Sequence, residues 1–293
     1  MSCSSLLSAL NDDQFSIPHK KVIPQFSIFE RLVLAAKTFF TFTEIDKKSR
    51  TFKTDENTKK LFEKVRSEKL TGHYTSDIEI PFEVIRKLYK RYDNMTFNDY
   101  MLAILGKSLY QYCIKKDIKN PKGVKCEVPV GHKKLPTGYH DINISNYLSV
   151  LELELPIVDS IREGYDTLKP YVQYLLQPEI QKQCINFTHL IPYFPKSFMM
   201  DEMIASSQGM HFGLSNLPFS DRPYYICGKQ VKKLRIFNNL VFDSCIYCFV
   251  FTYNDKVCFT TCVNENTDID GQMFHDLVIA EIQEQIEFLP KKS

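Results

Sequence analysis

The spacing of hydrophobic residues changes several times along the chain, and each change predicts a different element. From Met95 to Cys113, apolar residues return every three or four positions, as they do on the buried side of a helix. Thr96 stands where a helix N-cap belongs and Asp99 follows three residues later, which is the pattern of a capping box. We predict a central, buried helix here. The segment 274–289 is amphipathic and predicts a closing helix.

Strict alternation of apolar and polar residues predicts strands. In 145–157, Leu151, Leu153 and Leu155 alternate with glutamates, so one face is predicted to be buried and the other wet. Strand composition recurs at 124–130, at 210–218, and in a hairpin over 243–263.

Further helices are predicted over 159–185 and 197–205, and a strand at 78–80 is predicted to run into a helix that begins at Pro81. Because helices and strands interleave, with short hairpins and long crossovers, the predicted fold class is α/β.

The first part of the chain has a different character. Residues 26–42 form an apolar stretch too short to span a bilayer, interrupted by Glu30, Arg31 and Lys37. One interpretation is a helix with its apolar face on the core, and the other is an interfacial helix in a lipid surface. Residues 46–72 are dense in lysine and glutamate and predict a solvated connector with one short exposed helix at most.

Composition narrows the class of protein. The 293 residues include 37 Lys and Arg against 35 Asp and Glu, so there is no strong positive field to attract nucleic acid. The nine cysteines are odd in number and lie mostly in apolar segments, which favours reduced thiols in a cytosol-facing compartment. The start, MSCSSLLSALNDD, has no basic region, so secretion is not expected.

The residues alone identify no active site. Cys245, Cys248, Cys258 and Cys262 have a superficial zinc spacing, but odd separations on a strand place side chains on opposite faces, so they are interpreted as core thiols. His73 is followed four residues later by Asp77; on a strand this spans about 13 Å, too far for direct cooperation. The other histidines lack triad-like or metal-like spacing: His19, His132, His140, His189, His211 and His275.

Several short motifs nevertheless occur in a recognisable order. The helix predicted at 95–113 opens with Asn98-Asp99, and Leu102-Ala103 come next. The strand at 145–157 opens with Ser145-Asn146 and ends in Leu-Pro, and Ser215-Asn216 precede Pro218, with Gly228 further on. The hairpin and the closing helix complete the series.

This series resembles the second half of the bacterial and plant wax ester synthase/diacylglycerol acyltransferase (WS/DGAT) family. That family has a T-x-N-D-V-x-L-A helix, a strand that begins Leu-Gly-Asn, and a Ser-Asn-Val-Pro-Gly-Pro turn. The chain departs from the pattern at Ser145, where the family has Gly, and at Phe219-Ser220, where it has Gly-Pro. A related condensation or plant-type acyltransferase is an alternative with the same fold.

The resemblance implies a mixed-sheet sandwich of the CoA-dependent, chloramphenicol acetyltransferase-like fold, of which this chain is the C-terminal half. The implied reaction is acyl transfer from acyl-CoA, the co-substrate, to diacylglycerol or a fatty alcohol, with no bound cofactor and no metal. In the family the second His of His-His-x3-Asp-Gly is the general base. The enzyme would act at a cytosolic membrane face, such as that of the endoplasmic reticulum, or on a lipid droplet.

This chain contains no His-His pair. Its opening resembles the helix that the family carries just after that motif, so we expect the catalytic base upstream of Met1 and residues 1–293 to be inactive alone. The implied organisation is a helical remnant of the first half (1–45), a charged connector (46–75) and a C-terminal domain (76–293). The alternative is a non-catalytic half-protein that binds acyl lipids or pairs with a separate catalytic half.

The resemblance also marks four residues as substrate-binding: Asn98, Asp99, Ser215 and Asn216. Asn98 and Asp99 would begin a helix facing the catalytic tunnel, while the alternative is a helix cap and turn. Ser215 and Asn216 are expected at a strand end, where they bind backbone or the pantetheine arm. A nearby basic group could meet CoA phosphates or anionic lipid, or be a solvated face: Lys229, Lys232, Lys233 and Arg235.

Overall fold

The computed structural model describes five long stretches, 54–63, 71–131, 148–178, 209–240 and 244–289. It also describes Ser27, Phe29, Glu30, Val33, Ala36 and a few residues between 180 and 201. Three predictions lie largely outside these residues: the 1–45 segment, the helix over 197–205 and the start of the strand at Ser145.

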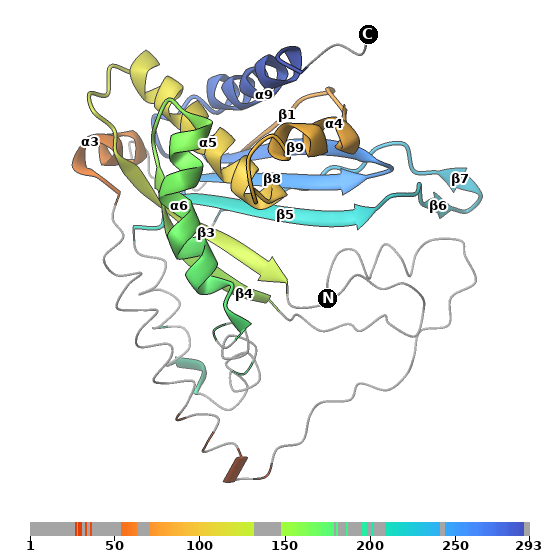
Figure 1. The fold of residues 1–293 in the computed structure, drawn as a ribbon, viewed down its shortest axis with the longest axis horizontal. Helices are drawn as coiled ribbons and strands as arrows, with labels where there is room; N and C mark the ends of the chain where they lie inside the picture. The colour runs from red at the N-terminus through yellow and green to blue at the C-terminus, as the bar shows by residue number, and fades with distance from the viewer. Residues whose placement is uncertain are drawn as a thin grey trace.

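One mixed sheet organises the described residues (Figure 1). Its strand order is β1-β9-β8-β5-β3-β4, and the short β2 pairs with β9 as well. β5 runs parallel to both β3 and β8, and the other pairs are antiparallel. The strands are β1 (Thr71–Thr75), β2 (Ile80–Pro81), β3 (Gly123–Gly131), β4 (Leu148–Pro156), β5 (Phe212–Ser220), β8 (Ile246–Tyr253) and β9 (Lys256–Asn264).

Helices pack against the sheet through a single large core. α5 (Phe97–Lys115) contacts α6 (Ile161–Leu175) and α9 (Gly271–Glu287), and its side chains Leu102, Leu105 and Leu109 are almost fully buried. Shorter helical elements are described at α3 (Glu56–Lys59), a 3-10 turn η1 (Lys60–Phe62) and α4 (Phe82–Tyr89). A separate hairpin, β6 (Tyr225–Ile226) and β7 (Lys229–Gln230), projects beyond the end of the sheet (Figure 1).

Several predicted elements are confirmed. α5 begins after Thr96 with the predicted capping box, and burial along β4 alternates with the leucines inward. β8 and β9 form the predicted hairpin, whose turn residues Asn254 and Asp255 have φ of 51° and 58°, as a type I′ turn requires. The α/β class with a mixed sheet is therefore correct.

In the predicted connector over 46–75, the described residues 54–63 and 71–75 are not solvated throughout. Its last residues form β1, paired with β9, and Leu61 and Phe62 are buried in the core. The strand predicted at 78–80 is reduced to Ile80–Pro81. The sequence pattern did not predict β1 because Thr71–Thr75 is a half-exposed edge strand. Such a strand has no strong alternation of apolar and polar residues.

Only part of the helix predicted over 26–42 is described. Phe29, Glu30, Val33 and Ala36 are helical, and Ser27 caps this turn by accepting a hydrogen bond from the Glu30 backbone N–H at 3.2 Å. Phe29 is 75% exposed and Val33 39% exposed, so these two side chains do not lie on the core. Among the described residues, no helix is both long enough and apolar enough to cross a bilayer.

Candidate functional site

The start of α5 is held by a closed set of polar contacts. The Asp99 carboxylate accepts hydrogen bonds from the Thr96 backbone N–H (2.9 Å) and hydroxyl (2.7 Å), and the Thr96 hydroxyl oxygen accepts one from the Asp99 N–H (3.2 Å). Both bonds reach Oδ2 of the carboxylate, and Asp99 is only 6% exposed. This geometry favours the helix-cap interpretation of Asp99 over a direct role in substrate binding.

Asn98 faces a different partner. Its Oδ1 accepts a hydrogen bond of 2.8 Å from Nδ2 of Asn216, on β5. The bond joins the first turn of α5 to a strand of the sheet across 118 positions of sequence. After this contact, Asn98 still has its two amide N–H donors and Asn216 its carbonyl oxygen, so the pair can both donate to and accept from a ligand.

Ser215 points away from this pair, and neither Ser215 nor Asn216 stands at the strand end expected from the sequence. Both lie inside β5, not at a strand end, and neighbours on a strand face opposite sides of the sheet. Ser215 is in register with Phe249, and Asn216 with Val250, which belongs to the helix-covered core. The expected turn at Pro218 is absent because β5 continues to Ser220 with a register shift.

The side of the sheet that carries Ser215 also carries a cluster of charged residues. Glu127 on β3 is directly opposite Glu152 on β4, and Lys125 forms an ion pair with Glu152 at 3.1 Å. Burial, and then the charge of Glu152, raise the pKa of Glu127 to about 6, while Lys125 lowers it. Near neutral pH the ionised Glu127 carboxylate therefore lowers the stability of the folded state.

We expect Glu127→Gln to stabilise the protein at neutral pH. Because the Glu127 pKa is higher folded than unfolded, the folded state binds more protons between about pH 4.5 and 6, and stability falls as pH rises through that window. The free energy of unfolding of Glu127→Gln should exceed that of the wild type by about 2 kcal/mol at most above pH 6. This difference should vanish below about pH 4. Thermal melts of both proteins from pH 4 to 8 measure it. A difference that does not change with pH would contradict this account.

The described histidines each have other contacts. His73 lies on β1 with its ring 4.9 Å from that of Phe237, His211 shares a hydrogen bond of 2.8 Å with Thr54, and buried His275 shares one of 3.0 Å with Thr261. Asp77, four residues after His73, binds Lys233 and Arg235 instead. This arrangement is consistent with the interpretation that His73 and Asp77 do not cooperate directly.

The cysteines of β8 and β9, together with Cys245 just before β8, lie mainly in the core, as predicted. Cys245, Cys248 and Cys262 are buried, and burial raises the pKa of the Cys248 and Cys262 thiols. Among the residues that the structure describes, no group of three His, Cys, Asp or Glu side chains is placed to hold a metal ion.

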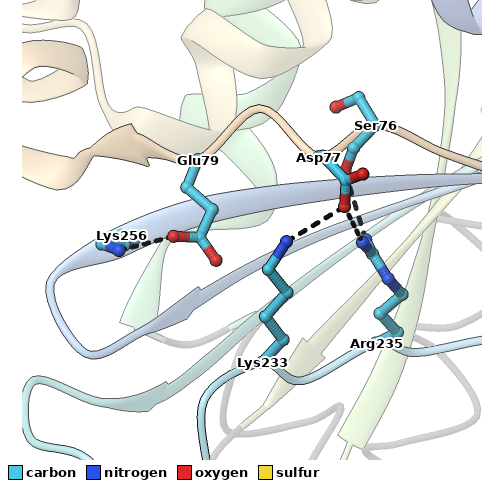
Figure 2. Close-up of polar contacts among 6 residues, drawn as sticks. All are labelled: Ser76, Asp77, Glu79, Lys233, Arg235 and Lys256. Atoms are coloured by element: carbon cyan, nitrogen blue, oxygen red, sulfur yellow. Dashed lines mark hydrogen bonds and ion pairs between the residues drawn. The ribbon is translucent and has the colours of Figure 1, made fainter.

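The predicted basic group is partly neutralised. Figure 2 shows Lys233 and Arg235 reaching the same carboxylate oxygen of Asp77, at 3.0 and 2.8 Å. Arg235 also donates to the Ser76 carbonyl oxygen at 3.2 Å, and Lys256 pairs with Glu79 close by. Lys229 and Lys232 are exposed.

Comparison with known proteins finds a family match over part of the chain. Residues 172–285 match the family model described as WS/DGAT C-terminal domain. The predicted resemblance is confirmed. The WS/DGAT match contains Ser215 and Asn216, whereas Asn98 and Asp99 precede it. No curated protein matches the chain.

Several solved structures share the fold of this chain. The wax ester synthase/diacylglycerol acyltransferase from Marinobacter aquaeolei VT8 is 17% identical, with a TM-score of 0.53 over 96% of this chain and 63% of that one. The EpoB NRPS cyclization-docking bidomain from Sorangium cellulosum is 9% identical, with a TM-score of 0.57 over 97% and 57%. The TRI3 trichothecene 15-O-acetyltransferase from Fusarium sporotrichioides is 11% identical, with a TM-score of 0.52 over 83% and 52%.

These matches confirm the predicted acyltransferase-like fold. This chain spans less than two thirds of the Marinobacter WS/DGAT, whose covered share is 63%. Sequence reasoning found Asn98 and Asn216 through their motifs but missed their contact, and it missed Asp77 as the partner of the basic group. Both contacts join segments more than a hundred residues apart, so no local pattern signals them.

Proposed function

We propose that this chain is part of an O-acyltransferase of neutral-lipid synthesis, which moves a fatty acyl group from acyl-CoA to diacylglycerol or a long-chain alcohol. The observation that carries the proposal is the Asn98–Asn216 pair. It joins two motifs of the WS/DGAT resemblance through a hydrogen bond of 2.8 Å, in a chain whose residues 172–285 match that family's C-terminal domain.

The proposed chemistry is direct transfer between two substrates. A general base takes the proton from the acceptor hydroxyl, whose oxygen attacks the thioester carbonyl carbon. The carbon–sulfur bond then breaks, and CoA leaves as a thiolate that takes up the proton. In this chain Asn98 would donate an amide N–H to the acyl carbonyl oxygen as negative charge develops there, and Asn216 would be a positioning residue for Asn98.

The general base is proposed to come from a first half that carries His-His-x3-Asp-Gly, because residues 1–293 contain no such motif. The same observation favours the second candidate, a non-catalytic half-protein that binds acyl lipids or pairs with a separate catalytic half. The two candidates differ in whether the native polypeptide is longer than this chain.

We expect the purified chain not to release CoA from palmitoyl-CoA above the protein-free rate, with diolein or hexadecanol as acceptor. Robust turnover by residues 1–293 would contradict the need for an external base. The 5′ end of the native transcript and the intact mass of the native protein then separate the candidates. A mass above 34.2 kDa with upstream His-His-x3-Asp-Gly supports the enzyme, and a mass near 34.2 kDa supports the half-protein.

A further inference from the structure

Positive charge is concentrated in one segment of the chain. Residues 222–242, which lie between Asp221 and Asp243, contain five lysines and arginines and no acidic residue, although the whole chain carries only +2: Arg222, Lys229, Lys232, Lys233 and Arg235. Asp77 neutralises one of these charges through its contacts with Lys233 and Arg235. A net positive charge therefore remains on this segment.

The same segment exposes large apolar side chains. Tyr225 and Ile226, on the β6–β7 hairpin, are 43% and 38% exposed, and Phe237 is 47% exposed. The hairpin is a two-stranded sheet of its own and projects past the main sheet (Figure 1). We call these apolar and basic residues together the basic-apolar surface: Tyr225, Ile226, Lys229, Lys232, Lys233, Arg235 and Phe237.

This surface is anchored to the fold at three points. The Tyr253 hydroxyl donates to the Val231 carbonyl oxygen at 2.6 Å and accepts from the Tyr224 N–H at 2.8 Å. Lys233 and Arg235 hold Asp77, beyond β1 (Figure 2), and the Leu240 N–H donates to the Thr71 hydroxyl at 3.2 Å. The segment therefore presents its exposed side chains from a defined position, although it has little regular structure.

We propose that the basic-apolar surface docks on a membrane containing anionic phospholipid. Lysines and arginines next to a bilayer are attracted by the negative headgroups, and aromatic and aliphatic side chains beside them suit the interface between headgroups and acyl chains. A soluble phosphate ligand would use the cations but not the exposed Ile226 and Phe237. This inference does not depend on acyl transfer, since it concerns where the protein lies and not what it catalyses.

Sedimentation with vesicles tests the proposal on the full 293-residue chain. We expect binding to phosphatidylcholine vesicles that contain phosphatidylserine, little binding to pure phosphatidylcholine, and release by added salt because screening shortens the range of the attraction. Lys229→Ser/Lys232→Ser should weaken binding by about thirtyfold. Ile226→Ser should weaken it several-fold at unchanged charge.

Matched variants separate this surface from a general charge effect. Lys87→Ser/Lys119→Ser removes the same charge from exposed positions on other parts of the fold, and Ile114→Ser removes an apolar side chain that is 52% exposed on α5. These controls should bind like the wild type, and circular dichroism checks that every variant is folded. The proposal is overturned if the lysine pairs weaken binding equally, or if phosphatidylserine makes no difference. Release by free CoA together with indifference to Ile226→Ser would overturn it in favour of a soluble phosphate ligand.

Discussion

Replacing Asn98 by alanine is expected to lower kcat of the active enzyme by about a hundredfold, with little change in the melting temperature. An amide that donates to a developing oxyanion contributes about that factor, because it acts only where charge develops in the transition state. The structural cost is smaller, since the lost contact is one partly buried amide hydrogen bond, worth about 1 kcal/mol. The measurement is acyl-CoA turnover in the assembly of this chain with the half that carries the proposed base.

A second variant separates the role of the Asn98 amide N–H as a donor from the role of its Oδ1 as an acceptor. Asn98→Asp keeps an oxygen that can accept from Asn216 Nδ2, but it has no N–H to offer a substrate. If Asn98 only braces α5 against β5, Asn98→Asp should retain most activity. If its amide N–H acts on the substrate, both variants should lose turnover to a similar degree.

Thr96→Ala is the matched control, because it lies two residues away and belongs to the helix cap. Losing its contacts with Asp99 should cost about 1 kcal/mol of stability while leaving kcat near the wild-type value. Equal losses of turnover in Thr96→Ala and Asn98→Ala would show that the start of α5 matters only as a structure.

Elements defined by local pattern were predictable from the sequence. α5 has a cap, a regular apolar spacing and sufficient length, and the β8–β9 hairpin has its turn residues between two apolar runs. In both cases the information lies within about twenty consecutive residues. The same reasoning failed for β1, because Thr71–Thr75 is half-exposed and its strand character comes from pairing with β9, nearly two hundred positions away.

The site shows the same division between local and distant information. Motif resemblance marked Asn98 and Asn216, and the structure brings them together. The resemblance groups Ser215 with Asn216 through the Ser-Asn-x-Pro motif, and the pattern over 210–218 predicts a strand that ends at Pro218. Proline is usually rare inside strands because it has no backbone N–H to donate, yet β5 continues past Pro218 through a register shift. Once β5 is extended, the period-two rule places Ser215 on the other side of the sheet.

The largest stability effect is expected at the contact between α5 and α9. The Glu281 side chain on α9 is completely buried, and Lys107 on α5 forms an ion pair with it at 2.9 Å. Gln285 and Gln111 donate to the two carboxylate oxygens at 2.9 and 3.3 Å. These contacts compensate a charge that would otherwise be held in the core without a counter-ion.

Lys107→Met should therefore destabilise the fold by about 3 to 5 kcal/mol, because it leaves the buried Glu281 carboxylate without its cation. Removing both charges together should cost much less, since well-packed apolar side chains can replace a buried ion pair at little cost. Denaturant unfolding of wild type, Lys107→Met, Glu281→Leu and the double variant measures the coupling between the two residues. A double variant that is as unstable as the sum of the single variants would mean that the pair does not act as a unit. In that case the rigidity of α5, and with it the placement of Asn98 against Asn216, would have to come from the apolar contacts of the core alone.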